Sequence, residues 1–235
     1  MKTQEQWIEL KNNLNIENRA FINGEYSAAI SGKTLDVVNP ATDETLTQIA
    51  RCQEEDVELA VTCARQAFLS GEWSNSAPSY RKAVLSQFAT LIDQHREELA
   101  LLETLDTGKP ISHSVSTDIP GAASALRWYA EAIDKVYGEV APTEQDVHAF
   151  VSHQAIGVVA AVVPWNFPLW LACWKLGPSL AAGNSVILKP SEKSSLTAIY
   201  IGQLANQAGL PRGVFQVVTG FGHEAGDALA KHHDG

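Results

Sequence analysis

Three apolar segments rich in β-branched residues recur in the second half of the chain, and each is followed by a helical pattern. The segments and their helices are 157–163 with 168–182, 185–189 with 195–208, and 214–219 with a short helix ending near 231. This alternation predicts parallel strands joined by right-handed crossovers. The expected fold class is therefore α/β, with three strands forming the first mononucleotide-binding half of a Rossmann-type, doubly wound sheet.

Helical periodicity also appears earlier in the chain. Residues 54–69 carry one apolar face, with acidic residues in the first turn and Gly71 as a stop. Ser79 is a candidate cap for a second helix, because its hydroxyl can accept a bond from an unpaired backbone N–H. The apolar face of that helix continues past Arg96 and ends at Gly108. A third helix is expected to follow and to stop near Gly138.

The remaining segments read as extended or irregular chain. Residues 1–20 form a polar, partly helical lead-in, and Asn23-Gly24 is typical of a tight hairpin turn. Residues 139–154 alternate apolar and polar positions around turn residues, which predicts an excursion of extended strands. The chain is thus expected to divide into an N-terminal part, this excursion and the first half of the nucleotide-binding sheet, at residues 1–138, 139–154 and 155–235.

Composition narrows the range of functions. The chain has 235 residues, a net charge of -10 and 45% hydrophobic residues, which suits a globular protein. The negative charge argues against a nucleic-acid partner, since phosphate contacts need clustered Lys and Arg. No apolar run approaches the ~20 residues that span a bilayer, and the N-terminus does not resemble a signal peptide. The sequence therefore predicts neither a nucleic-acid nor a membrane partner.

The cysteines and histidines give no metal or nucleophile pattern. The three cysteines (Cys52, Cys63 and Cys173) lack a C-x-x-C spacing, which favours reduced thiols in a cytoplasmic protein. Buried or inert thiols are expected at all three positions, since Cys173 lies too deep in its helix for the dipole to activate it. The pair His232-His233 has no partner at a ligand-like spacing, so no metal enzyme is predicted.

Asn166 stands just before the helix that Pro168 begins. Proline is tolerated at the first helical position, so unpaired backbone N–H groups surround Asn166. Its side-chain amide can donate to a developing oxyanion. The simpler interpretation is that Asn166 only caps the helix.

Lys189 and Glu192 follow the second strand, where dinucleotide-binding folds place groups that contact ribose hydroxyls. The alternative is a solvated Lys–Glu pair on the surface. The glycines of Gly220-Phe221-Gly222, with Ala225, match G-x-G-x-x-A, but they follow the third strand. A plain strand-to-helix turn remains the default interpretation there.

These motifs together resemble the aldehyde dehydrogenase superfamily, over nearly the whole chain. The resemblance is carried by Phe21-Ile22-Asn23-Gly24, Leu105-Asp106-Thr107-Gly108-Lys109-Pro110, Pro164-Trp165-Asn166-Phe167-Pro168, Trp174-Lys175-Leu176-Gly177-Pro178 and Lys189-Pro190-Ser191-Glu192. The segment 127–135 is most similar to the γ-glutamyl-γ-aminobutyraldehyde dehydrogenases of bacterial putrescine breakdown. The resemblance implies NAD(P)+-dependent oxidation of an aldehyde to a carboxylic acid.

The resemblance also implies roles for individual residues. Asn166 would be the oxyanion donor, and a carboxylate at Glu192 would favour NAD+ over NADP+ by repelling a 2′-phosphate. The cofactor would contact Val163, Pro164, Trp165, Lys189, Ser191, Glu192 and Gly222. One wall of the aldehyde tunnel would be formed by Phe167, Leu171 and Trp174. Val38 and Asp106 resemble a monovalent-cation site, and residues 139–154 would join subunits into a homo-oligomer.

The family's catalytic Cys, general-base Glu and Gly-Ser-Thr segment have no counterpart in this chain, which matches only an N-terminal half. The catalytic domain is expected to be absent, the chain alone to be inactive, and the third strand to be an aggregation-prone exposed edge. Two alternatives are a subunit of a split enzyme, completed by a separate C-terminal chain, and a non-enzymatic partner of intact family members.

Overall fold

The three expected parallel strands lie at the centre of the molecule. In the computed structural model, which describes residues 2–234, they are β7 (Val158–Val162), β8 (Ser185–Lys189) and β9 (Phe215–Val217). Strand β8 lies in the middle and pairs in parallel with both neighbours. The register places Val162 opposite Lys189, so the carboxyl ends of β7 and β8 meet at one edge of the sheet. The α/β prediction is confirmed.

The sheet is mixed rather than purely parallel. Its order is β2-β1-β9-β8-β7, because β1 (Ala20–Ile22) pairs antiparallel with β9 and continues into β2 (Glu25–Ser27). The turn between β1 and β2 has positive φ at both Asn23 (51°) and Gly24 (76°), as the Asn-Gly pattern predicted. The prediction of an exposed third strand is therefore wrong. The connections from β7 to β8 and from β8 to β9 move in the same direction across the sheet, so β9 lies next to β1. Within residues 2–234, β7 is the strand with only one neighbour at that end of the sheet.

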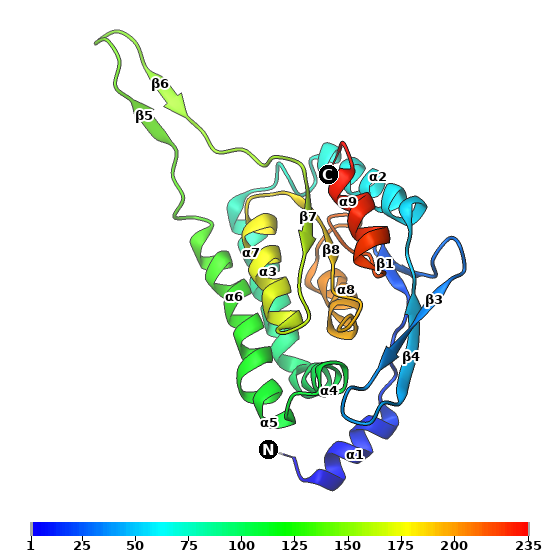
Figure 1. The fold of residues 1–235 in the computed structure, drawn as a ribbon. Coiled ribbons are helices and arrows are strands. Elements are labelled where there is room, and N and C mark those ends of the chain that lie inside the picture. The colour runs from blue at the N-terminus through cyan, green and yellow to red at the C-terminus, as the bar shows by residue number, and fades with distance from the viewer. Residues whose placement is uncertain (1, 235) are drawn as a thin grey trace.

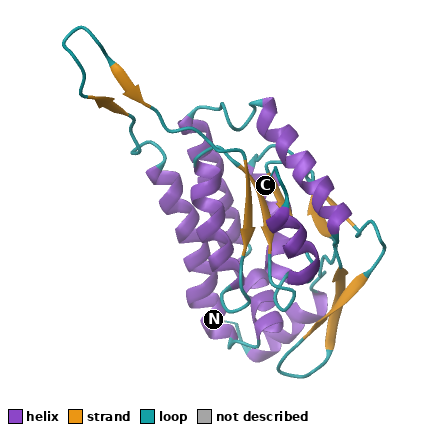
Figure 2. Cartoon of the chain, turned by 45° about the horizontal axis from the view of Figure 1, so that its top comes forward, coloured by secondary structure: helices purple, strands orange, loops and turns teal. Residues whose placement is uncertain are grey.

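Helices cover both faces of this sheet (Figures 1 and 2). Side chains alternate along β8: Val186 and Leu188 enter the larger core and Ile187 enters the smaller one. The larger core packs against α3 (Pro78–Gln94), α6 (Ile119–Ala132), α7 (Pro168–Ala181) and α8 (Leu196–Ala208). The smaller core packs against α2 (Glu54–Ser70) and α9 (Asp227–Lys231). Burial on both sides explains why the residues between Ser185 and Lys189 are all apolar.

The helix boundaries confirm some of the sequence signals and correct others. Gly71 ends α2 in a left-handed conformation, with φ of 78°. Ser79 is not a cap, because Pro78 already occupies the first turn and Ala77 is the N-cap residue, without a side-chain bond. The expected continuous face is split at His95, which separates α3 from α4 (Arg96–Thr107).

The third predicted helix begins with irregular turns and ends early. A short helix α5 (Ile111–His113) and a π-helical turn η1 (Ser114–Asp118) lead into α6. Helix α6 ends at Ala132 rather than near Gly138. Val136 is 66% exposed, so no burial stabilises another turn of the helix there.

The excursion is a hairpin that extends away from the helices and sheet (Figure 1). Its strands β5 (Glu139–Ala141) and β6 (Ala149–Val151) pair antiparallel, with Val140 opposite Phe150. A separate hairpin, β3 (Thr34–Val38) with β4 (Thr45–Ala50), flanks the opposite side, near the N-terminal helix α1 (Gln4–Asn13). Across residues 2–234, no helix combines the length and apolarity needed to cross a membrane.

Candidate functional site

Lys189 and Glu192 form an ion pair at the carboxyl end of β8. Lys189 is the last residue of the strand and is only 2% exposed. Its Nζ lies 3.7 Å from Oε2 of Glu192, whose side chain is partly exposed. Burial lowers the pKa of Lys189, and the neighbouring Glu192 carboxylate partly opposes that shift. The alternative of a solvated surface pair is wrong for Lys189, since a buried ammonium needs polar partners.

The turn that follows β8 is held by Ser191. Its Oγ accepts a bond from the backbone N–H of Lys193 at 3.2 Å. Its carbonyl accepts from the backbone of Ser194 at 3.1 Å and from Oγ of Ser195 at 2.8 Å. Ser191 therefore shapes the loop that carries Glu192, and the predicted cofactor contact of its hydroxyl stays a prediction.

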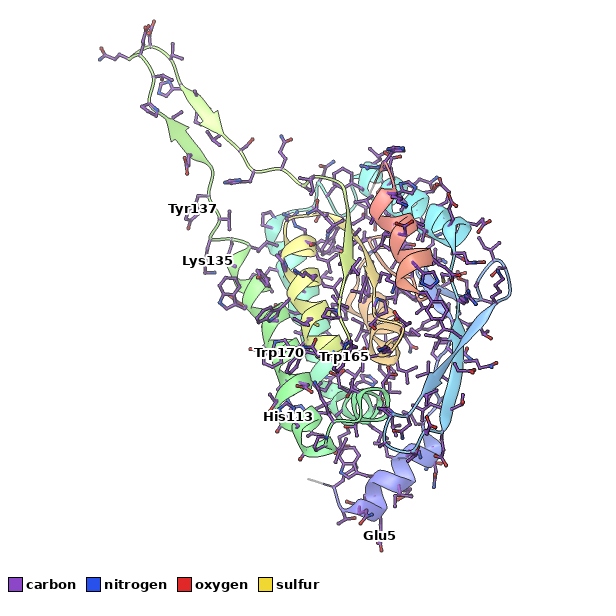
Figure 3. All side chains as sticks on the ribbon, in the orientation of Figure 1. Glu5, His113, Lys135, Tyr137, Trp165 and Trp170 are labelled. Carbon is purple, nitrogen blue, oxygen red and sulfur yellow. The ribbon has the colours of Figure 1, made fainter. Side chains whose placement is uncertain are left out.

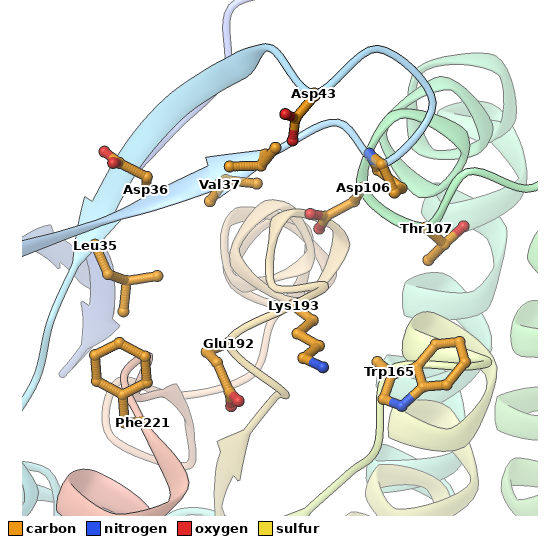
Figure 4. Close-up of a pocket in the computed structure, with 12 residues that line it drawn as sticks. Leu35, Asp36, Val37, Asp43, Asp106, Thr107, Trp165, Glu192, Lys193 and Phe221 are labelled. Carbon is orange, nitrogen blue, oxygen red and sulfur yellow. The ribbon is translucent and has the colours of Figure 1, made fainter.

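A cavity of about 700 Å³ opens beside this turn (Figure 4). Glu192 and Lys193 lie on one side of it, Trp165 on another, and strand β3 on a third. Trp165 is 55% exposed, whereas Val163 is buried and donates its N–H to the carbonyl of Lys189 at 3.1 Å. Pro164, between them, is exposed. The structure thus brings the ends of β7 and β8 together around one cavity.

Asn166 is exposed and does not cap α7. The N-cap residue is Phe167, which makes no side-chain capping bond, and Pro168 occupies the first helical turn, as predicted. Within residues 2–234 the side chain of Asn166 makes no hydrogen bond to the protein, so its N–H donors remain available. The capping interpretation is therefore wrong, because the helix starts one residue later than a cap at Asn166 requires.

Aromatic side chains extend from Asn166 along one side of α7. The rings of Phe167 and Trp170 pack edge to face with centroids 5.9 Å apart, and Trp170 packs in the same way on Trp174 at 6.3 Å. Trp174 is 55% exposed, and Leu171 is partly buried against the core. Phe167, Leu171 and Trp174 were predicted from the sequence as one wall of the aldehyde tunnel, but Trp170 was not. Its spacing of three and four residues from Phe167 and Trp174 was the available signal.

The glycines after β9 differ in what they allow. Gly220 has a φ of 126°, and a Cβ there would lie 2.7 Å from the carbonyl oxygen of Cys52, so only glycine fits. A Cβ on Gly222 would meet nothing within 4 Å. Gly222 lines an open cavity of about 720 Å³, together with Val162 and residues of the turn and helix that follow β9. This turn, η2 (Gly222–Gly226), leads into α9.

The candidate cation ligands belong to the cavity of about 700 Å³ beside Glu192. Val38 and Asp106 both line it. Asp106 is 3% exposed, and its Oδ2 accepts the backbone N–H of Leu196 at 2.9 Å. Its buried Oδ1 has no partner within residues 2–234, and burial raises the pKa of Asp106 to about 7. In the same residues, no three His, Cys, Asp or Glu side chains are grouped as a metal site.

The cysteines have the environment of inert thiols. Cys52 and Cys173 are fully buried, and Cys63 is partly buried on α2. Burial raises the pKa of all three, to about 12 for Cys52. A thiol with a raised pKa forms little thiolate at neutral pH, so none of the three is an activated nucleophile.

Comparison with known proteins points to a single family. Residues 26–235 match the aldehyde dehydrogenase family. The chain is 61% identical over 228 residues to the NADP/NAD-dependent aldehyde dehydrogenase PuuC of Escherichia coli strain K12, covering 97% of this chain and 46% of that protein. It is 47% identical over 232 residues to the aminoacetaldehyde dehydrogenase of Pseudomonas aeruginosa, covering 99% of this chain and 47% of that protein. The chain thus spans about half the length of the curated relatives it matches.

Solved structures give the same result. An indole-3-acetaldehyde dehydrogenase of P. syringae, solved with NAD+ and IAA, matches with a TM-score of 0.98 and 57% identity, over 100% of this chain and 47% of its own. The γ-glutamyl-γ-aminobutyraldehyde dehydrogenase of Burkholderia cenocepacia matches with a TM-score of 0.97 and 53% identity, over 99% of this chain and 47% of its own.

Proposed function

Because the chain belongs to the aldehyde dehydrogenase family, we propose that it supplies part of the NAD+ site of an enzyme that oxidises aldehydes. In that reaction the aldehyde gives a hydride to NAD+ and takes its second oxygen from water. The products are a carboxylic acid, NADH and a proton. The relatives are about twice as long, so this chain contributes one half of such an enzyme.

One observation carries the proposal: the buried ammonium of Lys189 beside Glu192, at the carboxyl end of the central strand. An ammonium donates hydrogen bonds and a carboxylate accepts them, so the pair fits the hydroxyls of the adenosine ribose. A 2′-phosphate near Glu192 would meet a like charge, which favours NAD+ over NADP+. The backbone of Val163, Pro164 and Trp165 would line the nicotinamide-ribose side. Gly222 leaves space for the adenine, and Ser191 fixes the loop of Glu192.

The aldehyde would bind beside Asn166. Its free side-chain amide would donate to the carbonyl oxygen as negative charge develops there. Phe167, Leu171 and Trp174, with Trp170 between them, would form an apolar wall for the chain of the aldehyde. The similarity to PuuC and to the Burkholderia enzyme supports an amine-derived substrate such as γ-glutamyl-γ-aminobutyraldehyde, in cytoplasmic putrescine breakdown. A monovalent cation at the carbonyl of Val38 and at Asp106 would support the loops of this site.

The hairpin would join two copies of the chain. Val140 and Phe150 are 64% and 75% exposed on paired strands, which is a large apolar surface for a single copy. We place residues 139–154 outside the nucleotide-binding unit formed by 1–138 and 155–235. A Phe150→Ser variant is then expected to lower the molecular mass in light scattering, whereas an unchanged mass would contradict this role.

Cofactor binding is tested by titrating the chain with NAD+ and with NADP+ in a calorimeter. Glu192→Gln is expected to weaken NAD+ binding about tenfold, since one charged hydrogen bond is lost. It is also expected to reduce the preference for NAD+ over NADP+. Glu5→Gln is the matched control, because Glu5 is an exposed carboxylate on α1, distant from Trp165 and the cavity (Figure 3). Equal NAD+ affinity of the two variants would refute the assignment of Glu192 to the cofactor site.

Activity is tested by co-expression with the C-terminal half of PuuC. The chain alone is expected to be inactive, since its three thiols are not activated nucleophiles. Aldehyde-dependent NADH formation only in the mixture would support a complementing half. Activity of the chain alone would contradict the assignment, and no activity in the mixture would favour a non-enzymatic partner.

A further inference from the structure

A group of buried charges lies under the start of α7. Glu103 on α4 and Asp118 at the end of η1 are both fully buried, and both face the side chain of Lys109. The Nζ of Lys109 lies 2.7 Å from Oδ2 of Asp118 and 3.9 Å from Oε1 of Glu103. The ring of His113 also approaches Asp118, with Nδ1 at 3.4 Å.

Asp118 is the counter-ion in this group. Burial raises the pKa of Glu103 to about 8, so its carboxyl is mostly protonated at neutral pH. One cation and one carboxylate then remain, which is the balanced arrangement that a buried site requires. The ammonium of Lys109 is therefore fixed in position by a short, charge-assisted hydrogen bond.

The same ammonium lies over the ring of Phe167, 4.0 Å from its centroid. This is well inside the range of a cation–π contact, and partial burial of Lys109 strengthens it. Trp170 holds the ring by an edge contact. Phe167 is also the N-cap residue of α7 and lacks a side-chain capping bond.

We propose that Lys109 is a positioning residue, whose ammonium, held by Asp118, fixes Phe167 and thereby the orientation of Asn166. Asn166 directly precedes Phe167 and makes no hydrogen bond of its own within residues 2–234, so its backbone direction depends on its neighbour. The π-helical turn η1 brings Asp118 beneath the ammonium. This inference rests on the proposed function, in which Asn166 is the oxyanion donor.

The test follows the side-chain amide of Asn166 by NMR in the 15N-labelled chain, with Asn166→Asp identifying its signal. Lys109→Met is expected to shift or broaden that signal. It is also expected to raise hydrogen exchange at the backbone N–H of Leu171, which is bonded to the carbonyl of Phe167, by about fivefold, because one cation–π contact is lost. Lys109→Arg keeps a cation over the ring and is expected to restore both. Lys135→Met, an exposed lysine outside this group, is expected to change neither.

A second variant keeps the test decisive if Lys109→Met does not fold. Phe167→Leu removes the aromatic face, leaves the buried charges paired, and is expected to change the Asn166 signal in the same way. Lys109→Met added to Phe167→Leu is then expected to have no further effect on that signal.

An unchanged Asn166 signal in folded Lys109→Met or in Phe167→Leu would overturn the inference, as would a failure of Lys109→Arg to restore it. The NAD+ titration is a separate readout. If the chain binds no NAD+ while the Asn166 signal responds as expected, the proposed function fails and the positioning contact stands.

Discussion

Replacing Glu103 by Gln should make the chain more stable at alkaline pH. Glu103 is fully buried and accepts a bond from Oγ1 of Thr197 at 3.3 Å, while its other carboxyl oxygen makes no hydrogen bond within residues 2–234. Glutamine has nearly the same shape and keeps an acceptor for Thr197. It carries no ionisable group, so the variant isolates the effect of charging this site.

The magnitude follows from the pKa difference between the two states. The ordinary pKa of the group is 4.5, and burial raises the pKa to about 8 in the folded chain. Between these values the folded state holds a proton that the unfolded state has released, so stability falls as pH rises through this window. A difference of about 3.5 units (8 minus 4.5) corresponds to a loss of about 5 kcal/mol above pH 8, and to almost none below pH 4.5.

Urea unfolding followed by far-UV circular dichroism, repeated between about pH 5 and about pH 9, measures this contribution. We expect Glu103→Gln to match the wild type within about 1 kcal/mol at the acidic end. Toward the alkaline end, the free energy of unfolding of the variant should exceed that of the wild type by several kcal/mol. Asp106, whose pKa is also raised by burial, is present in both proteins and cancels in the difference. Parallel curves for the two proteins would refute the reasoning.

Two further substitutions, with Gly222→Ala as a control, test contacts in the larger core. Gly202→Ala on α8 would place a Cβ 2.6 Å from the buried ring of Phe21, so we expect a loss of about 1–3 kcal/mol in urea unfolding. Gly222→Ala, whose Cβ meets nothing within 4 Å, should stay within about 0.5 kcal/mol, and equal losses would contradict the steric argument. Trp73→Phe removes the bond from Nε1 to the carbonyl of Leu180 at 3.1 Å in a buried site. We expect about 1–3 kcal/mol less stability, and an unchanged melting temperature would show that this bond contributes nothing.

Features that depend on neighbouring residues in the chain could be predicted from the sequence. The apolar run before Lys189 predicted a parallel strand, and Asn23-Gly24 predicted a tight hairpin turn, because backbone preference and side-chain period act locally. Gly71 ended its helix for the same reason. The order of strand, turn and helix then placed Trp165 and Glu192 at one edge of the sheet, as observed.

The tertiary structure decided which groups are buried and which distant segments pair. Strand β1 covers β9 across almost 200 residues of chain, which no local pattern indicates. Lys189 is buried at the end of β8, between the helices on both faces of the sheet. The sequence alone also fitted a Lys–Glu pair on the protein surface. Asn166 has no capping role because Phe167 is the N-cap residue of α7. The ammonium over the ring of Phe167 comes from Lys109, in the loop after α4, and its carboxylate partner is Asp118 on η1. Periodicity specifies each element by itself, whereas burial and charge pairing arise only when the elements pack.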